Sequence, residues 1–106
     1  MQNEISTAIV KRFFEAIRTL IEMKHIRGIK TFTDKYDINR WNFLSLEKEP
    51  NRNLFQLEWM FYICRDFNVS PYWLLSGEGE MFTDGMIQKA VNTLKEQTSM
   101  GTVKIV

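Results

Sequence analysis

The sequence contains a single cysteine and a single histidine among its 106 residues. Because Cys64 has no partner in the chain, an intrachain disulfide bond and a cysteine-built metal cage are both excluded. His25 has no second histidine and no clustered carboxylates at ligand spacing, so we expect no metal site and no cofactor. Cys64 is predicted to be a small buried hydrophobe, and His25 to lie at a helix end whose dipole favours it.

Long apolar runs are also absent. No apolar stretch is close to the length of a membrane span, which is about 20 residues. The opening Met-Gln-Asn-Glu-Ile lacks the basic region and apolar core of a secretory leader. We therefore expect a cytoplasmic protein with no membrane partner. Hydrophobic residues make up 44% of the chain and charged residues 25%, which is typical of one globular domain.

A strong net charge is lacking as well, because the formal charge of the chain is only +1. Such a balance argues against a general binder of polyanions. The distribution is uneven: residues 1–53 carry ten bases and seven acids, net +3, and the remainder carries four bases and six acids, net −2. A basic half of this kind favours a molecule with one side directed toward nucleic acid.

Helical periodicity is the strongest positive signal in the chain. Apolar residues recur every three or four positions between about Glu4 and His25, which predicts a long amphipathic helix. Neither glycine nor proline interrupts this run. The predicted core positions of this helix are Ile5, Ile9, Phe13, Ala16, Ile17, Leu20 and Ile21.

Residues 28–46 predict two short helices joined by a sharp bend. Gly28 suits an N-cap, Phe32 and Tyr36 give an apolar stripe, and Asp37 stands at the bend because aspartate tolerates a left-handed backbone. The second helix is expected to open near Asn39, after Ile38. Its expected buried residues are Phe43 and Leu46, and its outward residues are Arg40, Trp41, Asn42 and Ser45. This pattern is typical of a DNA-reading helix-turn-helix, although small all-α domains often show the same outline with a merely solvated face.

The second half of the chain predicts a helix over Leu54 to Asn68 with apolar residues on two sides. One side comprises Leu57, Met60, Phe61, Cys64 and Phe67, and the other Phe55, Trp59 and Tyr62. The two-helix unit is expected to cover one of these sides. We expect a C-terminal helix carrying Met86, Ile87, Ala90, Val91 and Leu94 to cover the other side, that of Phe55, Trp59 and Tyr62, within the chain or across a dimer.

A closing segment follows at residues 68–82. Ser70 suits an N-cap, Pro71 the first helical position, and Gly77 a helix end, with Trp73, Leu74 and Leu75 expected to dock on the core. The run Val-Ser-Pro-Tyr-Trp-Leu-Leu-Ser-Gly-Glu-Gly resembles the last helix of phage-repressor-type, lambda-repressor-like helix-turn-helix domains. Glu47, which follows Leu46, is similar to the Ile/Leu-Glu pair that ends the reading helix of that family. The resemblance extends from about Lys11 to Phe82.

This resemblance implies an all-α fold of five helices that binds double-stranded DNA. In such a fold residues 1–82 form the DNA-binding domain, and residues 83–106 add a short helix and tail suited to dimerisation. The sequence departs from the family pattern at Asp37, where a turn glycine is usual, and at Ile29, where a polar phosphate-binding residue is often found. The loop at Pro50 to Asn53 is also longer.

Two groups of residues are expected to contact DNA, the first because the resemblance implies it and the second because its members flank the reading helix. The base-reading group is Arg40, Trp41, Asn42 and Ser45, and the phosphate-binding group is Lys30, Thr31, Asn39, Lys48 and Arg52. Each assignment has an alternative: Arg40 can instead pair with Asp34 or Asp37, Trp41 can pack on the protein, and the loop around Arg52 can be merely polar. We expect a small transcriptional regulator, most simply a repressor, that reads a palindrome as a homodimer with half-sites ~34 Å apart.

The alternative hypothesis is a helix-turn-helix fold used as a protein-interaction module. Its motivation is a set of apolar residues suited to an interface: Trp41, Leu44, Phe55, Trp59 and Tyr62. An enzyme is not expected, since Glu78 and Glu80 have no partners for acid–base work and Gly77-Glu-Gly79 lacks the lysine of a phosphate loop. No small-molecule substrate is evident in the sequence.

Overall fold

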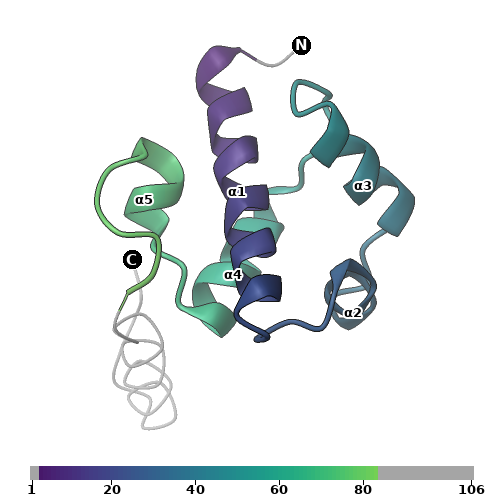
Figure 1. Ribbon diagram of the computed structural model, residues 1–106. Helices are drawn as coiled ribbons and strands as arrows, with labels where there is room; N and C mark the ends of the chain where they lie inside the picture. The colour runs from purple at the N-terminus through teal and green to yellow at the C-terminus, as the bar shows by residue number, and fades with distance from the viewer. Residues whose placement is uncertain (1–2, 84–106) are drawn as a thin grey trace, which may run out of the picture.

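The computed structural model describes residues 3–83, and the regular secondary structure of this part of the chain is α-helical. The helices are α1 (Glu4–Glu22), α2 (Ile29–Lys35), α3 (Arg40–Lys48), α4 (Leu57–Phe67) and α5 (Pro71–Ser76). In Figure 1, α1 runs through the middle of the molecule, with α2 and α3 on one side of it and α5 on the other. The predicted all-α class is confirmed for these residues. The predicted helix over Met86 to Leu94 lies outside the described residues.

The core is built around one phenylalanine of α1. Phe13 is fully buried, and its ring centroid lies 5.2 to 6.4 Å from the centroids of Phe14, Phe32, Phe43, Phe55 and Trp59. These rings come from α1, α2, α3, α4 and the segment that precedes α4. Edge-to-face and tilted ring pairs each contribute about 0.5–1.5 kcal/mol beyond the burial of their area. The aromatic residues thus join four helices at a single point.

The first helix ends earlier than its periodicity predicted. α1 stops at Glu22 because Lys24 adopts a left-handed backbone (φ 63°) and the N–H of His25 bonds back to the Leu20 carbonyl at 2.9 Å. This Schellman-type ending reverses the chain, so that Ile26 is buried. The predicted core position of Ile5 was wrong, since this side chain is 70% exposed. Buried positions that the predicted stripe omitted are Val10 and Phe14.

The prediction for α4 was wrong in its extent. Residues 51–56 form turns and an extended segment, so the helix begins at Leu57. Trp59 is buried against Phe13 and Phe43, and Tyr62 stacks on Tyr36 with ring centroids 4.3 Å apart. Side chains of α1, of α3 and of the end of α2 thus pack on that side, and the C-terminal helix that was expected to cover it lies outside the described residues. The exposed side of α4 is the one that carries Leu57 and Phe61, 76% and 54% exposed.

The closing segment forms α5 with the predicted caps. The Ser70 hydroxyl accepts a hydrogen bond from the Trp73 N–H at 3.2 Å, Pro71 opens the helix, and Gly77 (φ 79°) ends it. Trp73 and Leu74 are buried, whereas Leu75 is exposed, which corrects its predicted docking on the core. α5 packs against α1, and the Arg12 side chain of α1 donates to the carbonyls of Leu74 at 2.7 Å and Leu75 at 3.0 Å.

Candidate nucleic-acid interface

The connection between α2 and α3 is a defined turn. Asp37 adopts the left-handed conformation predicted for it (φ 54°), and the N–H of Ile38 bonds to the carbonyl of Thr33 at 2.8 Å. The buried Thr33 hydroxyl donates back to carbonyls of its own helix, so no polar group of its side chain is left without a partner. α2 is seen nearly end-on in Figure 1 while α3 runs across the view, so the axes of the two helices are steeply inclined to each other. The sharp bend is confirmed.

The start of α3 is fixed by Asn39. The side-chain oxygen of Asn39 accepts a hydrogen bond from the N–H of Asn42 at 2.9 Å, which is an N-cap contact. Phe43 and Leu46 are fully buried, as predicted, and they anchor the inner face of α3. Since its oxygen caps the helix, Asn39 retains only its amide N–H groups for an external partner.

The four predicted base-reading residues share the outer part of α3 but differ in exposure. Trp41 is 79% exposed, Arg40 and Asn42 are exposed, and Ser45 is half-buried. Within residues 3–83 Arg40 forms no ion pair, so the alternative pairing with Asp34 or Asp37 is not made. The positive charge of Arg40 nevertheless acts on Asp34. The pKa of Asp34 is lowered mainly by the hydrogen bond from Lys30 and to a lesser extent by the charge of Arg40.

A hollow of about 350 Å³ adjoins the exposed tryptophan. The residues that line it come from α1 and α3 and are Arg18, Trp41, Leu44, Ser45, Glu47 and Lys48. Arg18 donates two hydrogen bonds to the Glu47 carboxylate, at 2.7 and 2.6 Å, and this contact raises the pKa of Arg18. The geometry leaves Nη1 of Arg18 outside both bonds. Arg18 is thus a further cation beside α3 that the sequence did not single out.

The predicted phosphate-binding residues fall into two groups. Lys30 and Thr31 are exposed on α2, and Lys30 pairs with Asp34 at 2.7 Å. Lys48 is exposed at the end of α3, and Arg52 lies 3.6 Å from Glu49 in the following loop. Exposed ion pairs of this kind contribute little stability. Lys30 and Arg52 are therefore able to exchange their carboxylate partner for a DNA phosphate at a small cost in free energy.

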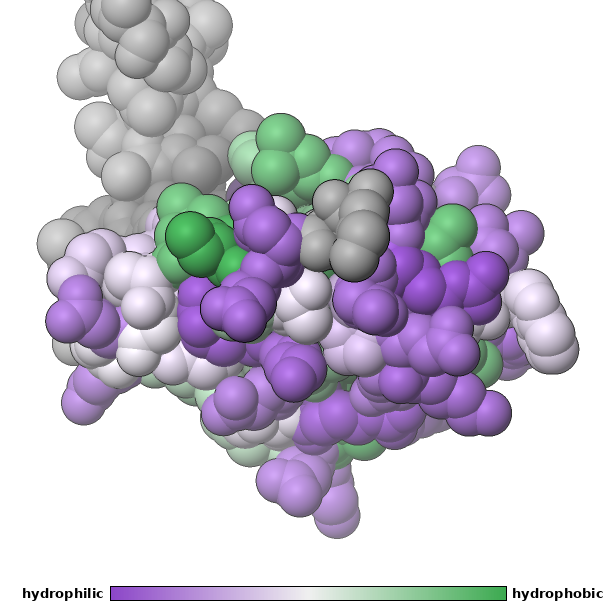
Figure 2. All heavy atoms as spheres, turned by 90° about the horizontal axis from the view of Figure 1, so that it is seen from above, coloured by the Kyte–Doolittle hydropathy of each residue, from purple (hydrophilic) through white to green (hydrophobic). Residues whose placement is uncertain are grey.

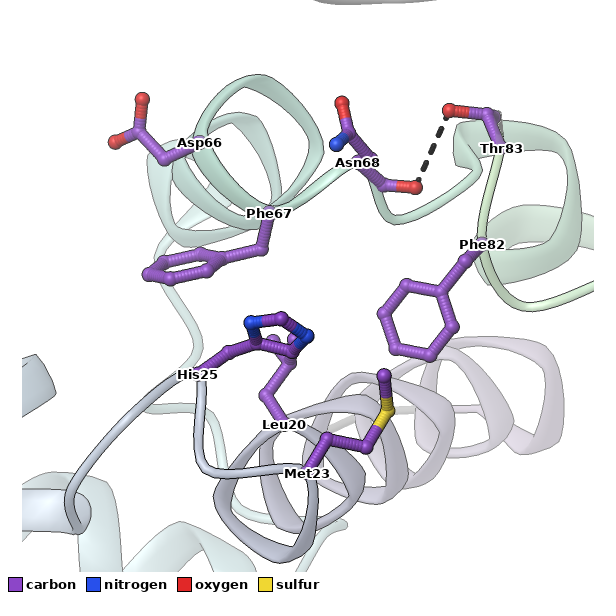
Figure 3. A pocket seen from close by; sticks show the side chains of 8 residues that line it. All are labelled: Leu20, Met23, His25, Asp66, Phe67, Asn68, Phe82 and Thr83. Carbon is purple, nitrogen blue, oxygen red and sulfur yellow. Dashed lines mark hydrogen bonds between the residues drawn. The ribbon is translucent and has the colours of Figure 1, made fainter. Parts of the chain in front are cut away.

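A second hollow, beside the C-terminal end of α1, has a different character. Figure 3 shows the side chains of Leu20, His25, Phe67 and Phe82 turned toward one another, while Asp66 points away. The Thr83 hydroxyl donates to the Asn68 carbonyl at 3.3 Å and closes this side. Across residues 3–83 no three His, Cys, Asp or Glu side chains are grouped as metal ligands. Phe82 also forms an isolated antiparallel bridge with Val69, so this hollow belongs to the packing of the chain's last described turn.

None of the described helices is long and apolar enough to cross a membrane. No protein-family model, no curated protein and no solved structure matches this chain. The function of the chain is therefore inferred from the geometry and chemistry of α2, α3 and their surroundings.

Proposed function

We propose that this chain is a small, sequence-specific DNA-binding regulator with a lambda-repressor-like helix-turn-helix fold. One observation carries the proposal: α3 is anchored by two fully buried side chains and capped by Asn39, while Arg40, Trp41 and Asn42 are exposed on its outer side. A rigid helix with polar and aromatic side chains projecting from it is what the major groove of B-DNA admits.

The exposed side chains match the donor and acceptor pattern of base edges. Arg40 is suited to a bidentate contact with guanine O6 and N7, and Asn42 to adenine N6 and N7, each discriminating by about 1–3 kcal/mol. Trp41 offers an apolar surface to a thymine methyl group. Ser45 is half-buried and short, so it reaches a base edge or phosphate only at close approach.

The cations around α3 serve the phosphate backbone in this proposal. Lys30 and Thr31 lie on α2, Lys48 and Arg52 lie at and after the end of α3, and Asn39 contributes its amide N–H groups. Phosphate contacts of this kind fix the register of a protein on the duplex without reading its sequence. To the expected set we add Arg18, which Glu47 holds beside α3 with Nη1 outside the ion pair.

The test is fluorescence anisotropy of the protein with a randomised duplex pool at two salt concentrations. We expect salt-sensitive binding and enrichment of a preferred sequence. Arg40→Ala is expected to relax base preference, and Arg40→Lys is the matched control: it keeps the charge, and hence the salt dependence, but loses the bidentate fork. Lys30→Ala is expected to weaken all sequences alike and to lower the salt slope by about one. Absence of binding at low salt refutes the proposal.

A protein-interaction role is the second candidate, and one observation favours it. Trp41 is 79% exposed beside a hollow, and tryptophan often anchors protein interfaces. The rest of the aromatic set expected for such a surface does not support it, because Trp59 is buried while Phe55 and Tyr62 are half-buried against other rings. If DNA fails to bind, Trp41→Ala is the variant that tests this role in a search for a protein partner.

A further inference from the structure

A polar hollow of about 220 Å³ lies beside the start of α3. Its lining comes from residues 36–42, between the end of α2 and the first turn of α3, and from residues 54–62, which lead into the first half of α4. Hydrophilic side chains, drawn in purple, cover most of the face of the molecule seen in Figure 2, so a polar lining alone does not mark a binding site. The sign of its charge and the way its wall is held distinguish this hollow, which we call the acidic hollow.

The charge of the acidic hollow is of one sign. Asp37 and Glu58 line it, and none of the residues that line it is basic. Within residues 3–83 neither carboxylate forms an ion pair. Asp37 also has a left-handed backbone (φ 54°), which glycine would adopt with less strain, so the chain carries a carboxylate here at some cost. A recess lined by charges of one sign concentrates their field, and this recess attracts cations.

The aromatic wall of the acidic hollow is held in place by contacts of its own. Tyr36 stacks on Tyr62 with ring centroids 4.3 Å apart and planes 6° from parallel, and the Tyr36 hydroxyl donates to the Asp66 carboxylate. Trp59, which also lines the hollow, is buried in the core. The apolar part of the lining is completed by Ile38 and Leu54. A preformed apolar wall with a few polar groups is typical of a small-molecule site.

We propose that the acidic hollow binds a small aliphatic amine. An ammonium group supplies the positive charge that Asp37 and Glu58 lack within the described chain, and its N–H groups can donate to the side-chain oxygens of Asn42 and Gln56, which line the same hollow. The methylene groups of the amine lie against the apolar wall. A bare metal ion is a poorer occupant, because no three His, Cys, Asp or Glu side chains are grouped as ligands in residues 3–83.

The acidic hollow shares two residues with the proposed DNA interface. Asn39 and Asn42 both line it, and Asn42 is one of the proposed base-reading residues. Bidentate pairing with adenine uses the side-chain oxygen and the amide N–H group of asparagine together. An amine that takes the oxygen of Asn42 therefore removes the preference for adenine at that base pair. This coupling alone rests on the proposed function, whereas binding of the amine does not.

NMR titration of the isotope-labelled full chain, without DNA, tests the site. The probe is putrescine, a four-carbon diamine, at about 0.1 M salt, where distant surface charges are screened. We expect saturable shifts of the side-chain amide signals of Asn39, Asn42 and Gln56, with a Kd on the order of 1 mM for so small a ligand. Butanediol of the same chain length carries no charge and is expected to give no saturable shift.

Charge-removing variants locate the site. Asp37→Asn and Glu58→Gln are each expected to raise the Kd about threefold to fivefold, as for exposed ion pairs, and the double variant about tenfold or more. Asparagine tolerates the left-handed backbone at position 37, so the turn is kept. Glu80→Gln is the matched control: it removes the same charge from an exposed residue that follows α5, on the other side of α1, and is expected to leave the Kd unchanged. Circular dichroism confirms that each variant is folded.

Three results overturn the proposal: no saturable shift with putrescine, equal binding of butanediol, or an unchanged Kd in the double variant. The coupling to DNA is judged separately, from the affinities for a preferred duplex and for one changed at the base pair that Asn42 contacts. Saturating putrescine is expected to lower the ratio of these affinities about tenfold, and a ratio that stays constant refutes the coupling but not the site. A chain that binds putrescine at these residues and binds no DNA supports the site and refutes only the proposed function.

Discussion

Replacing Arg12 by methionine is expected to destabilise the domain by about 2 kcal/mol. Arg12 links α1 to α5 through two charge-assisted hydrogen bonds, from Nε to the Leu74 carbonyl and from Nη2 to the Leu75 carbonyl. These carbonyls lie in the last turn of α5, where helices have unsatisfied acceptors and favour cations. α5 has six residues and depends on such contacts, because an isolated helix of that length is not stable in water.

The magnitude follows from the environment of the two bonds. A hydrogen bond to a charged group contributes about 1.5–3 kcal/mol. The Nε bond is part-buried, so we assign it about 1.5 kcal/mol, the low end of that range. The Nη2 bond is exposed and screened by solvent, so it adds about 0.5 kcal/mol, and the sum is about 2 kcal/mol. Methionine preserves most of the aliphatic stem of the side chain, so the change reports the loss of the hydrogen bonds and charge more than the loss of packing.

Urea unfolding followed by tryptophan fluorescence measures the effect. With a slope of about 1–1.5 kcal/mol/M for a chain of this size, the midpoint is expected to fall by about 1.3–2 M. Arg12→Lys keeps the charge but not the fork and is expected to lose about half as much. A loss below about 0.5 kcal/mol for Arg12→Met refutes the reasoning, since it would mean that water replaces the guanidinium at α5 without penalty.

Two further predictions concern groups with shifted pKa values. The Tyr36 phenol is partly buried and donates to the Asp66 carboxylate, and both effects, burial first, raise the pKa of Tyr36. Because the folded state holds this proton more tightly, the stabilisation is present below about pH 10 and is lost as the pH rises further. Between pH 7 and pH 11 the free energy of unfolding, measured with urea, is therefore expected to fall less for Tyr36→Phe than for the wild type. Equal decreases in the two proteins contradict the assignment. Burial raises the pKa of Cys64 to about 11. A thiol reagent such as DTNB is therefore expected to react with the native protein only as fast as the protein opens. Rapid reaction at pH 8, without urea, would show that Cys64 is accessible.

The sequence predicted best the parts of the fold that are determined locally. Asp37 at the bend, Asn39 before α3, and the Ser70-Pro71 start of α5 all act within three or four residues, and each lies where its chemistry indicated. The exposed positions of Arg40, Trp41 and Asn42 followed from the same helical spacing.

The errors arose where tertiary contacts decide. α4 carries apolar residues on two of its sides, so helical periodicity could not indicate that Trp59 faces the core and Leu57 faces outward. The pairing of Arg18 with Glu47 spans 29 positions, and that of Arg12 with the α5 carbonyls spans more than 60, so no local spacing could indicate either contact. Only the packing of the helices determines which charged residues of α1 bond to α3 and which bond to α5.

The Phe13 ring contacts link the site to the cooperativity of the whole domain. α2 has seven residues and α3 nine, well short of the ~12–15 at which an isolated helix becomes marginally stable. Both are tied by Phe32 and Phe43 to one ring of α1. The turn between them therefore has no stability of its own, and we expect the Ile38 amide proton, which bonds to the Thr33 carbonyl, to exchange with solvent when the core itself opens. Any ligand that holds α3 consequently slows the opening of every helix that meets at Phe13, however far from the ligand that helix lies.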